Sequence, residues 1–247
     1  MDAADRLKRI TRVAWLDATS IAKTNPLFLL GPFLIPLSLL LVMFLYTGDR
    51  NLAFLLAGAV VFQAINAGTI VFSDFSAQKI YFKLQDLYCA SPARPSVYAY
   101  SKGLSRFLTN VPAALAYLAL ALYYSHAPLY VVPVIIVLLV FLLVVLTSLS
   151  FFASTLVSGE TDVFMIGNIF TFTAFLLSPV YYPITALPAF AQPYAFLFPA
   201  TGPALLTQWA FGLLAPAAWM VQLALLSMAC YAVVAYAALR AARWREN

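Results

Sequence analysis

Residues 27–46 read LFLLGPFLIPLSLLLVMFLY, a run with no charged side chain. About 20 apolar residues in a helix cross the roughly 30 Å hydrocarbon core of a bilayer, so this run predicts a transmembrane helix. The composition points the same way, because 64% of the 247 residues are hydrophobic and only 9% are charged. Soluble domains carry about 25% charged residues. The sequence therefore predicts an all-α polytopic membrane protein.

The other charge-free stretches predict five further spans. Residues 107–159 are uncharged and are broken by a polar SHAP sequence at 125–128, and residues 163–239 are also uncharged. Each of these stretches has room for two spans. We therefore predict a single transmembrane domain, residues 1–247, with six spans at about 27–46, 52–73, 104–124, 130–157, 163–182 and 214–239.

The positions of lysine and arginine predict the orientation. With six spans, every Lys and Arg except Arg50 falls on the same side of the membrane. Positive residues accumulate in cytoplasmic loops, so we expect both termini to lie in the cytoplasm and the chain to lie in the cell membrane. The net charge of +5 then reflects topology, and we expect no nucleic-acid partner.

Residues 1–25 are too polar for a cleavable signal peptide. On a helical projection, apolar side chains from Leu7 to Ala22 share one arc, and the opposite arc carries Lys8, Arg9, Arg12 and Lys23. This pattern predicts an amphipathic helix that lies in the membrane interface among lipid headgroups. The helix serves either as an anchor alone or also as a contact for a partner.

Two segments do not fit a simple bundle of spans. Residues 76–96 form a long polar connection, in which KIYFKLQDLY at 79–88 alternates at helical spacing before two prolines end the helix. It predicts a short amphipathic helix that docks another protein or lies on the lipid surface. Residues 183–212 are uncharged and rich in proline and aromatic residues, which predicts a re-entrant or surface-hugging outer hairpin.

Polar side chains recur on one face of three predicted spans. Such faces in membranes point toward protein or a cavity. One of them, at the span 130–157, carries small hydroxyl residues that are typical of close helix packing: Thr147, Ser150, Ser154 and Ser158. The other two faces comprise Gln63, Asn66, Thr69 and Ser73 in the second span and Asn168, Thr171, Phe172 and Phe175 in the fifth.

At the two unusual segments the chain resembles the membrane subunit of type-2 ABC exporters, a family that includes drug, lipid and polysaccharide permeases. In the inner loop the resemblance rests on Leu84, Leu87, Ser91-Pro92 and Arg94. In the outer hairpin it rests on Pro183, Leu187-Pro188, Tyr194 and Pro199. The order of elements extends it to the whole chain, although Tyr88-Cys89 departs from the small or aliphatic residues usual in the loop.

The resemblance implies roles for these residues. The inner helix would be a coupling helix that contacts an ATPase through Lys83, Leu84, Asp86, Leu87, Tyr88, Ser91 and Pro92. The polar faces of the second and fifth spans would line the translocation path, with interhelical hydrogen bonding as the alternative. The outer gate would comprise Pro183, Leu187, Pro188, Tyr194 and Pro199.

The resemblance also implies an assembly. No GxxxxGK[ST] motif occurs in the chain, so ATP and Mg²⁺ are expected on a separate ABC ATPase subunit, in two copies. A second permease subunit is expected as well, a homodimer or a heterodimer. We expect no catalytic residue and no metal site, since the chain has a single histidine.

The substrate is the least determined feature. Polysaccharide-exporting members of the family that the chain resembles often have a run of Arg and Lys just before the first span. Here Lys23 is the only basic residue in 21–26. The resemblance therefore favours a drug-like or lipid-like solute over a polysaccharide or glycolipid. Two other classes remain open. An intramembrane lipid-modifying enzyme would need clustered His, Asp, Glu or Cys. An ion-coupled secondary transporter would need acidic residues within spans.

Overall fold

The computed structural model describes residues 3–47, 51–80, 95–157 and 159–242, and every regular element in them is helical. Three short 3-10 helices, Pro26–Leu30, Leu129–Val131 and Ile184–Ala186, connect longer elements. The α-helices are α1 Ala3–Thr24, α2 Gly31–Thr47, α3 Leu52–Ile80, α5 Pro95–Ser125, α6 Val132–Leu156, α7 Glu160–Leu176, α8 Gln192–Ala195, α9 Thr201–Ala210 and α10 Ala218–Ala241.

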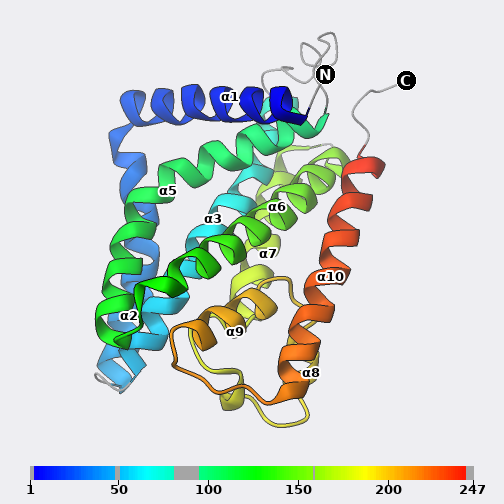
Figure 1. Ribbon diagram of the computed structural model, residues 1–247. Helices are drawn as coiled ribbons and strands as arrows, with labels where there is room; N and C mark the ends of the chain where they lie inside the picture. Colours follow the sequence, from blue (N-terminus) through cyan, green and yellow to red (C-terminus); the bar gives the residue numbers. More distant parts are fainter. Residues whose placement is uncertain (1–2, 48–50, 81–94, 158, 243–247) are drawn as a thin grey trace.

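The long helices run between two ends of an elongated bundle (Figure 1). Helix α1 lies across one end, the α1 end, and the C-terminal end of α10 is found there as well. The short helices α8 and α9 lie at the opposite end, the hairpin end. Every described Lys and Arg belongs to α1, the last turn of α3, the first half of α5 or the last turn of α10, all toward the α1 end.

Four helices of the described chain are long and apolar enough to cross a membrane: Leu52–Ile80, Ser96–Ser125, Leu129–Leu156 and Ala218–Ala241. A fifth crossing is formed if α1 and α2, bent by 107° at their junction, count as one span. Helix α7 is shorter, with 17 residues. The protein is thus an all-helical membrane protein with four or five candidate spans, and the count of six stays a prediction.

Helices α3, α5 and α7 each have a boundary well away from that of the predicted span. Helix α3 continues to Ile80, past the predicted limit at 73. Helix α7 ends at Leu176, before the predicted limit at 182, because Pro179 disfavours helical geometry in the residue before it. Helix α5 begins at Pro95, well before 104, and has 31 residues. At 1.5 Å per residue it is about 46 Å long, longer than the hydrocarbon core. Its first half runs beneath α1 before the helix turns along the bundle (Figure 1).

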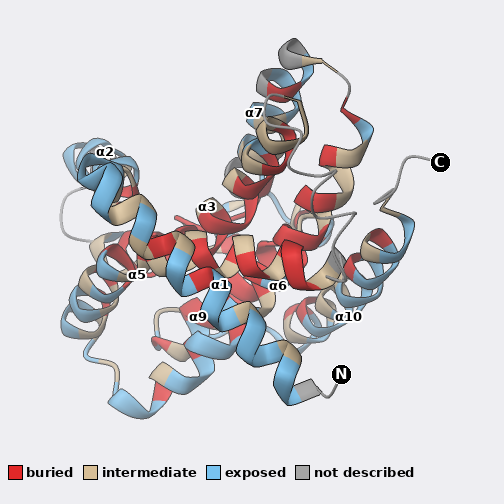
Figure 2. Cartoon of the chain, turned by 90° about the horizontal axis from the view of Figure 1, so that it is seen from above, coloured by how far each residue is buried: buried red, intermediate tan, exposed pale blue. Residues whose placement is uncertain are grey.

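Helix α3 is the centre of the bundle, as the buried residues in Figure 2 show. In its most apolar 18-residue window 83% of residues are buried, against 17% in α10. Glycine permits the close packing: a Cβ on Gly68 would lie 2.6 Å from the Leu146 Cβ. Beside it, Ser150 Oγ donates to the Gly68 carbonyl at 2.7 Å, which confirms the predicted role of the small residues in α6.

Candidate translocation site

The predicted path residues of α3 divide into two groups. Gln63 and Thr69 are buried within the subunit, and Thr69 Oγ1 donates to the carbonyl of Ile65 at 2.9 Å. Asn66 is half-buried and Ser73 is exposed. A Cβ on Gly167 of α7 would lie 3.4 Å from the Ser73 Oγ, so the structure brings Ser73 beside α7.

Gln63 forms a hydrogen bond to a backbone carbonyl that Pro36 leaves without a donor. Pro36 lies inside α2 and has no N–H, so the carbonyl of Pro32, one turn earlier, loses its helical donor. Gln63 Nε2 donates to that carbonyl at 3.1 Å. Asn110 Nδ2 of α5 in turn donates to the backbone carbonyl of Gln63 at 3.1 Å. Gln63 thus satisfies the carbonyl that Pro36 leaves without a donor, and the two side-chain bonds together link α2, α3 and α5.

Helix α7 presents the other predicted path residues on an exposed side. Asn168 is exposed, Thr171 is half-buried and Phe172 is 54% exposed. Met165 and Ile169 add apolar surface to the same side. The side chain of Phe175 lies outside the described residues. The structure therefore leaves a mixed amide, hydroxyl and aromatic surface on α7.

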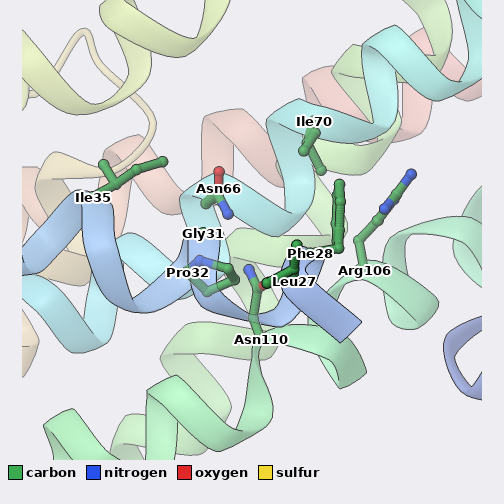
Figure 3. A pocket seen from close by; sticks show the side chains of 9 residues that line it. All are labelled: Leu27, Phe28, Gly31, Pro32, Ile35, Asn66, Ile70, Arg106 and Asn110. Atoms are coloured by element: carbon green, nitrogen blue, oxygen red, sulfur yellow. The ribbon is translucent and has the colours of Figure 1, made fainter. Parts of the chain in front are cut away.

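A cavity of about 290 Å³ lies at the junction of four elements (Figure 3). It contains Asn66 of the predicted path. The other lining residues come from the turn before α2, from α2, and from α3 and α5; they are Leu27, Phe28, Gly31, Pro32, Ile35, Ile70, Arg106 and Asn110.

Arg106 at this cavity is half of an ion pair that the sequence analysis missed. Its Nε and Nη2 donate to the two carboxylate oxygens of Asp74 on α3. The side chains are only 14% and 17% exposed, and the guanidinium carbon lies 4.8 Å from the centre of the Phe28 ring. The sequence feature that could have predicted this pair is an acidic residue at the end of the second predicted span and a basic residue at the start of the third.

The predicted ATPase contacts, from Lys83 to Pro92, lie outside the described residues, but the helices on both sides of them are described. Lys79 Nζ donates to the carbonyls of Thr155 and Val157, at 3.3 and 3.1 Å, where α6 ends. On the other side, the Tyr98 ring lies 5.2 Å from the ring of Phe75. Residues 81–94 therefore join two helices that are anchored to the bundle.

A second ion pair fastens α1 to α5. Lys102 Nζ donates to both carboxylate oxygens of Asp17 at 3.0 Å, and Ser105 Oγ donates to the same carboxylate at 2.8 Å. Ala14 and Ala18 are buried on the same side of α1. The helix predicted for residues 1–25 is thus present as α1 and packs on α5, the helix that follows residues 81–94; its place in the membrane interface stays a prediction.

At the hairpin end, the predicted gate residues surround a short 3-10 helix and α8. Pro183 and Leu187 flank the 3-10 helix, Tyr194 is 66% exposed, and Pro188 and Pro199 lie in the connecting turns. The sequence analysis did not predict a role for Gln208 of α9, which bonds to the loop before the 3-10 helix. Its Nε2 lies 3.2–3.3 Å from the carbonyls of Pro179, Val180 and Tyr182.

Gly58 of α3 allows the loop after α7 to approach. A Cβ at this position would lie 2.6 Å from the Val180 carbonyl oxygen and 2.8 Å from the Tyr181 ring.

In the described part of the chain, no three His, Cys, Asp or Glu side chains gather as they would around a metal ion.

These features agree with a comparison against known families. The sequence pattern of the ABC-2 type transporter family matches residues 10–204, a range that contains α2–α8, the cavity and both ion pairs. A search of curated proteins finds no match. Because the family pattern covers most of the chain, the protein belongs to the ABC-2 type transporter family.

Proposed function

We propose that this membrane subunit exports a hydrophobic or amphipathic solute, drug-like or lipid-like, across the cell membrane. Permeases of this family work with an ABC ATPase subunit, and the chain itself has no GxxxxGK[ST] motif. ATP and Mg²⁺ would bind to that subunit. The proposed assembly has two permeases, as a homodimer, and two ATPases, with the α1 end in the cytoplasm.

The family match carries the proposal, since the matched range, residues 10–204, includes residues 81–94 and both adjoining helices. We propose that the ATPase docks on this segment through Leu84 and Leu87. The anchoring of Lys79 and Tyr98 supports this assignment, because a force applied to a short segment moves the bundle only if its supports do not yield separately.

The contacts of α3 and α5 suggest how such a movement would spread. The two helices share the Asp74–Arg106 ion pair and the Asn110–Gln63 hydrogen bond, so they would move together. At the far end, α3 contacts the loop after α7 through Gly58. The movement would open a path along the exposed residues of α7, and their mixed amide, hydroxyl and aromatic chemistry suits an amphipathic solute.

The docking role is tested by expressing the chain with the ABC ATPase of the same organism and measuring copurification and solute-stimulated ATP hydrolysis. Leu87→Asp is expected to abolish both, since it places a charge in an apolar contact, whereas Leu87→Met is expected to preserve them. Ser20→Asp, an exposed position on α1, is the matched acidic control. Unchanged copurification with Leu87→Asp would refute docking at this segment.

A further inference from the structure

We propose that a groove between α1 and α5, here called the α1–α5 groove, binds an anionic phospholipid. The lipid phosphate would lie beside Arg12, and an acyl chain would lie against α5. This inference goes beyond the proposed export function and does not depend on it. The family match assigns no ligand to this face of α1.

The α1–α5 groove is an open depression of about 710 Å³, within the size range of ordinary ligand sites. Arg12 is the only charged residue that lines it. The other lining residues are Thr11, Trp15 and Leu16 of α1 and Leu104 and Leu108 of α5. The groove therefore combines one cation with apolar walls, the combination that the phosphate and the acyl chains of a lipid require.

Helix α1 is fastened to α5 by residues outside the groove. Asp17 pairs with Lys102, and at 3.6 residues per turn Asp17 lies about 160° from Trp15 around the helix. Ala14 and Ala18, which fall between these two sides of α1, are buried. A lipid could therefore occupy the groove on the Trp15 side without breaking the contact that holds α1 in place.

The charge of α1 beside the groove is complementary to a phosphate. Residues 7–16 read LKRITRVAWL, with three cations and no acid. Lys8 lies one turn before Arg12 on the same face, and both are exposed. Asp5 is two turns from Arg12, and Asp17 is already engaged by α5. A phosphate at Arg12 would therefore gain charge-assisted hydrogen bonds with no carboxylate in the groove to compete.

The apolar walls suit an acyl chain. Trp15 is exposed, and tryptophan is enriched where the hydrocarbon of a bilayer meets its headgroups. On α5, Leu104 and Leu108 are half-buried, and Leu115, seven residues further along, is exposed. These three leucines recur at helical spacing. They provide an apolar track that leads from the groove along α5 toward the hairpin end (Figure 1).

The groove also lies at the end of the bundle where headgroups are expected. Helices α1 and α2 are bent by 107° at their junction, so α1 lies close to the membrane plane if α2 crosses the bilayer. The described lysines and arginines gather at the same end (Figure 1). Anionic lipids are concentrated in the cytoplasmic leaflet and attract basic residues at its surface.

A groove near the hairpin end provides a comparison within the same molecule. It has a volume of about 360 Å³ and is lined by Pro193 and Phe196 on one side and by Leu226 and Tyr231 of α10 on the other. None of its lining residues is charged. It can accept an acyl chain, but it offers no group that selects the charge of the headgroup. The charge of the lipid should therefore matter only at the α1–α5 groove.

The test is photolabelling of the full chain in nanodiscs, first alone and then with the ABC ATPase of the same organism. The probes are phosphatidylglycerol and phosphatidylcholine with identical chains and a photoreactive diazirine near the glycerol, and labelled residues are mapped by mass spectrometry. We expect phosphatidylglycerol to label residues 11–16 and 104–108 about fivefold more than phosphatidylcholine, the effect of about one cation at the membrane surface. The groove at the hairpin end should be labelled equally by both.

Four variants separate charge from shape. Arg12→Gln is expected to reduce phosphatidylglycerol labelling about fivefold and to leave phosphatidylcholine labelling unchanged, whereas Arg12→Lys should retain most of it. Lys23→Gln is the matched control, because it removes an exposed cation of the same helix that does not line the groove. Leu108→Trp narrows the groove and should reduce labelling by both lipids.

The proposal is wrong if the two lipids label the groove equally, if Arg12→Gln has no larger effect than Lys23→Gln, or if Leu108→Trp elutes as a folded protein and is labelled like wild type. Labelling that persists in the complex with the ATPase supports a lipid site. Labelling that the ATPase abolishes assigns the groove to a protein contact and refutes it. The chain alone gives the lipid result whether or not Leu87→Asp prevents docking, so the two proposals fail separately.

Discussion

The two ends of the bundle are joined by different chemistry. At the α1 end, helices are connected through charged groups: Lys102 to Asp17, Arg106 to Asp74, and Lys79 to two carbonyls where α6 ends. At the hairpin end, the described contacts are made by neutral donors, Gln208 above all, onto backbone carbonyls in a proline-rich loop.

This difference follows from whether charged side chains are stable at each end. Charges are tolerated where water and headgroups lie close, and they accumulate on the cytoplasmic side. The stretch 163–239 has no charge, so its irregular backbone must be satisfied by amide and hydroxyl groups or by water. The comparison teaches that the α1 end is held by bonds between charged groups and the hairpin end by hydrogen bonds between neutral groups.

The largest effect is expected at the α1 end, from Arg106→Leu. This change leaves the Asp74 carboxylate largely buried without its partner, which typically costs about 3–5 kcal/mol. We expect a marked fall in the thermal unfolding midpoint in detergent. The double variant with Asp74→Leu should recover most of it, because no unpaired charge remains. If the single and double variants unfold at the same temperature, the pair does not hold this end.

At the hairpin end, Gln208→Leu is expected to cost on the order of 3 kcal/mol, because buried carbonyls lose their donor. The effect should be local, with faster proteolysis between 179 and 200 and smaller changes elsewhere. Gln222→Leu, at an exposed position on α10, provides the control. Equal proteolysis of the two variants would contradict the role assigned to Gln208.

The contact between α3 and the loop after α7 is tested by Gly58→Ala. The added Cβ would overlap the Val180 carbonyl, and overpacking of this kind costs about 1–3 kcal/mol. Gly31→Ala serves as the comparison, since a Cβ there meets nothing within 4 Å. Similar unfolding midpoints for the two variants would show that the loop moves aside freely.

The smallest effect is expected from Asp17→Asn. The carboxylate is 27% exposed, and partly solvated pairs contribute about 1 kcal/mol or less. We expect a slightly lower unfolding midpoint, whose difference from wild type shrinks further as salt screens the pair. A loss as large as that of Arg106→Leu would mean that α1, rather than the Asp74–Arg106 pair, dominates this end.

Much of the architecture could be read from residue patterns. The amphipathic pattern of residues 1–25 predicted the helix that is present as α1, and the row of hydroxyl residues that includes Thr147 and Ser150 predicted the close packing of α6. The hydrogen-bond partners of the polar residues could not be predicted from residue patterns. Gln63 looked like a path residue, yet its amide satisfies a carbonyl freed by Pro36, a relation across 31 positions that helical spacing alone does not show.

The sequence by itself determined that this protein resides in a membrane and that its charges gather near one end, because hydrocarbon excludes charge whatever the packing of the helices. It also determined the family, through a pattern that spans residues 10–204. Only the tertiary structure decided that α3 is central, that Asp74 meets Arg106, and that Asn66 opens onto a cavity while Gln63 does not. Those outcomes depend on which helices become neighbours, and similar apolar faces permit many arrangements of neighbours.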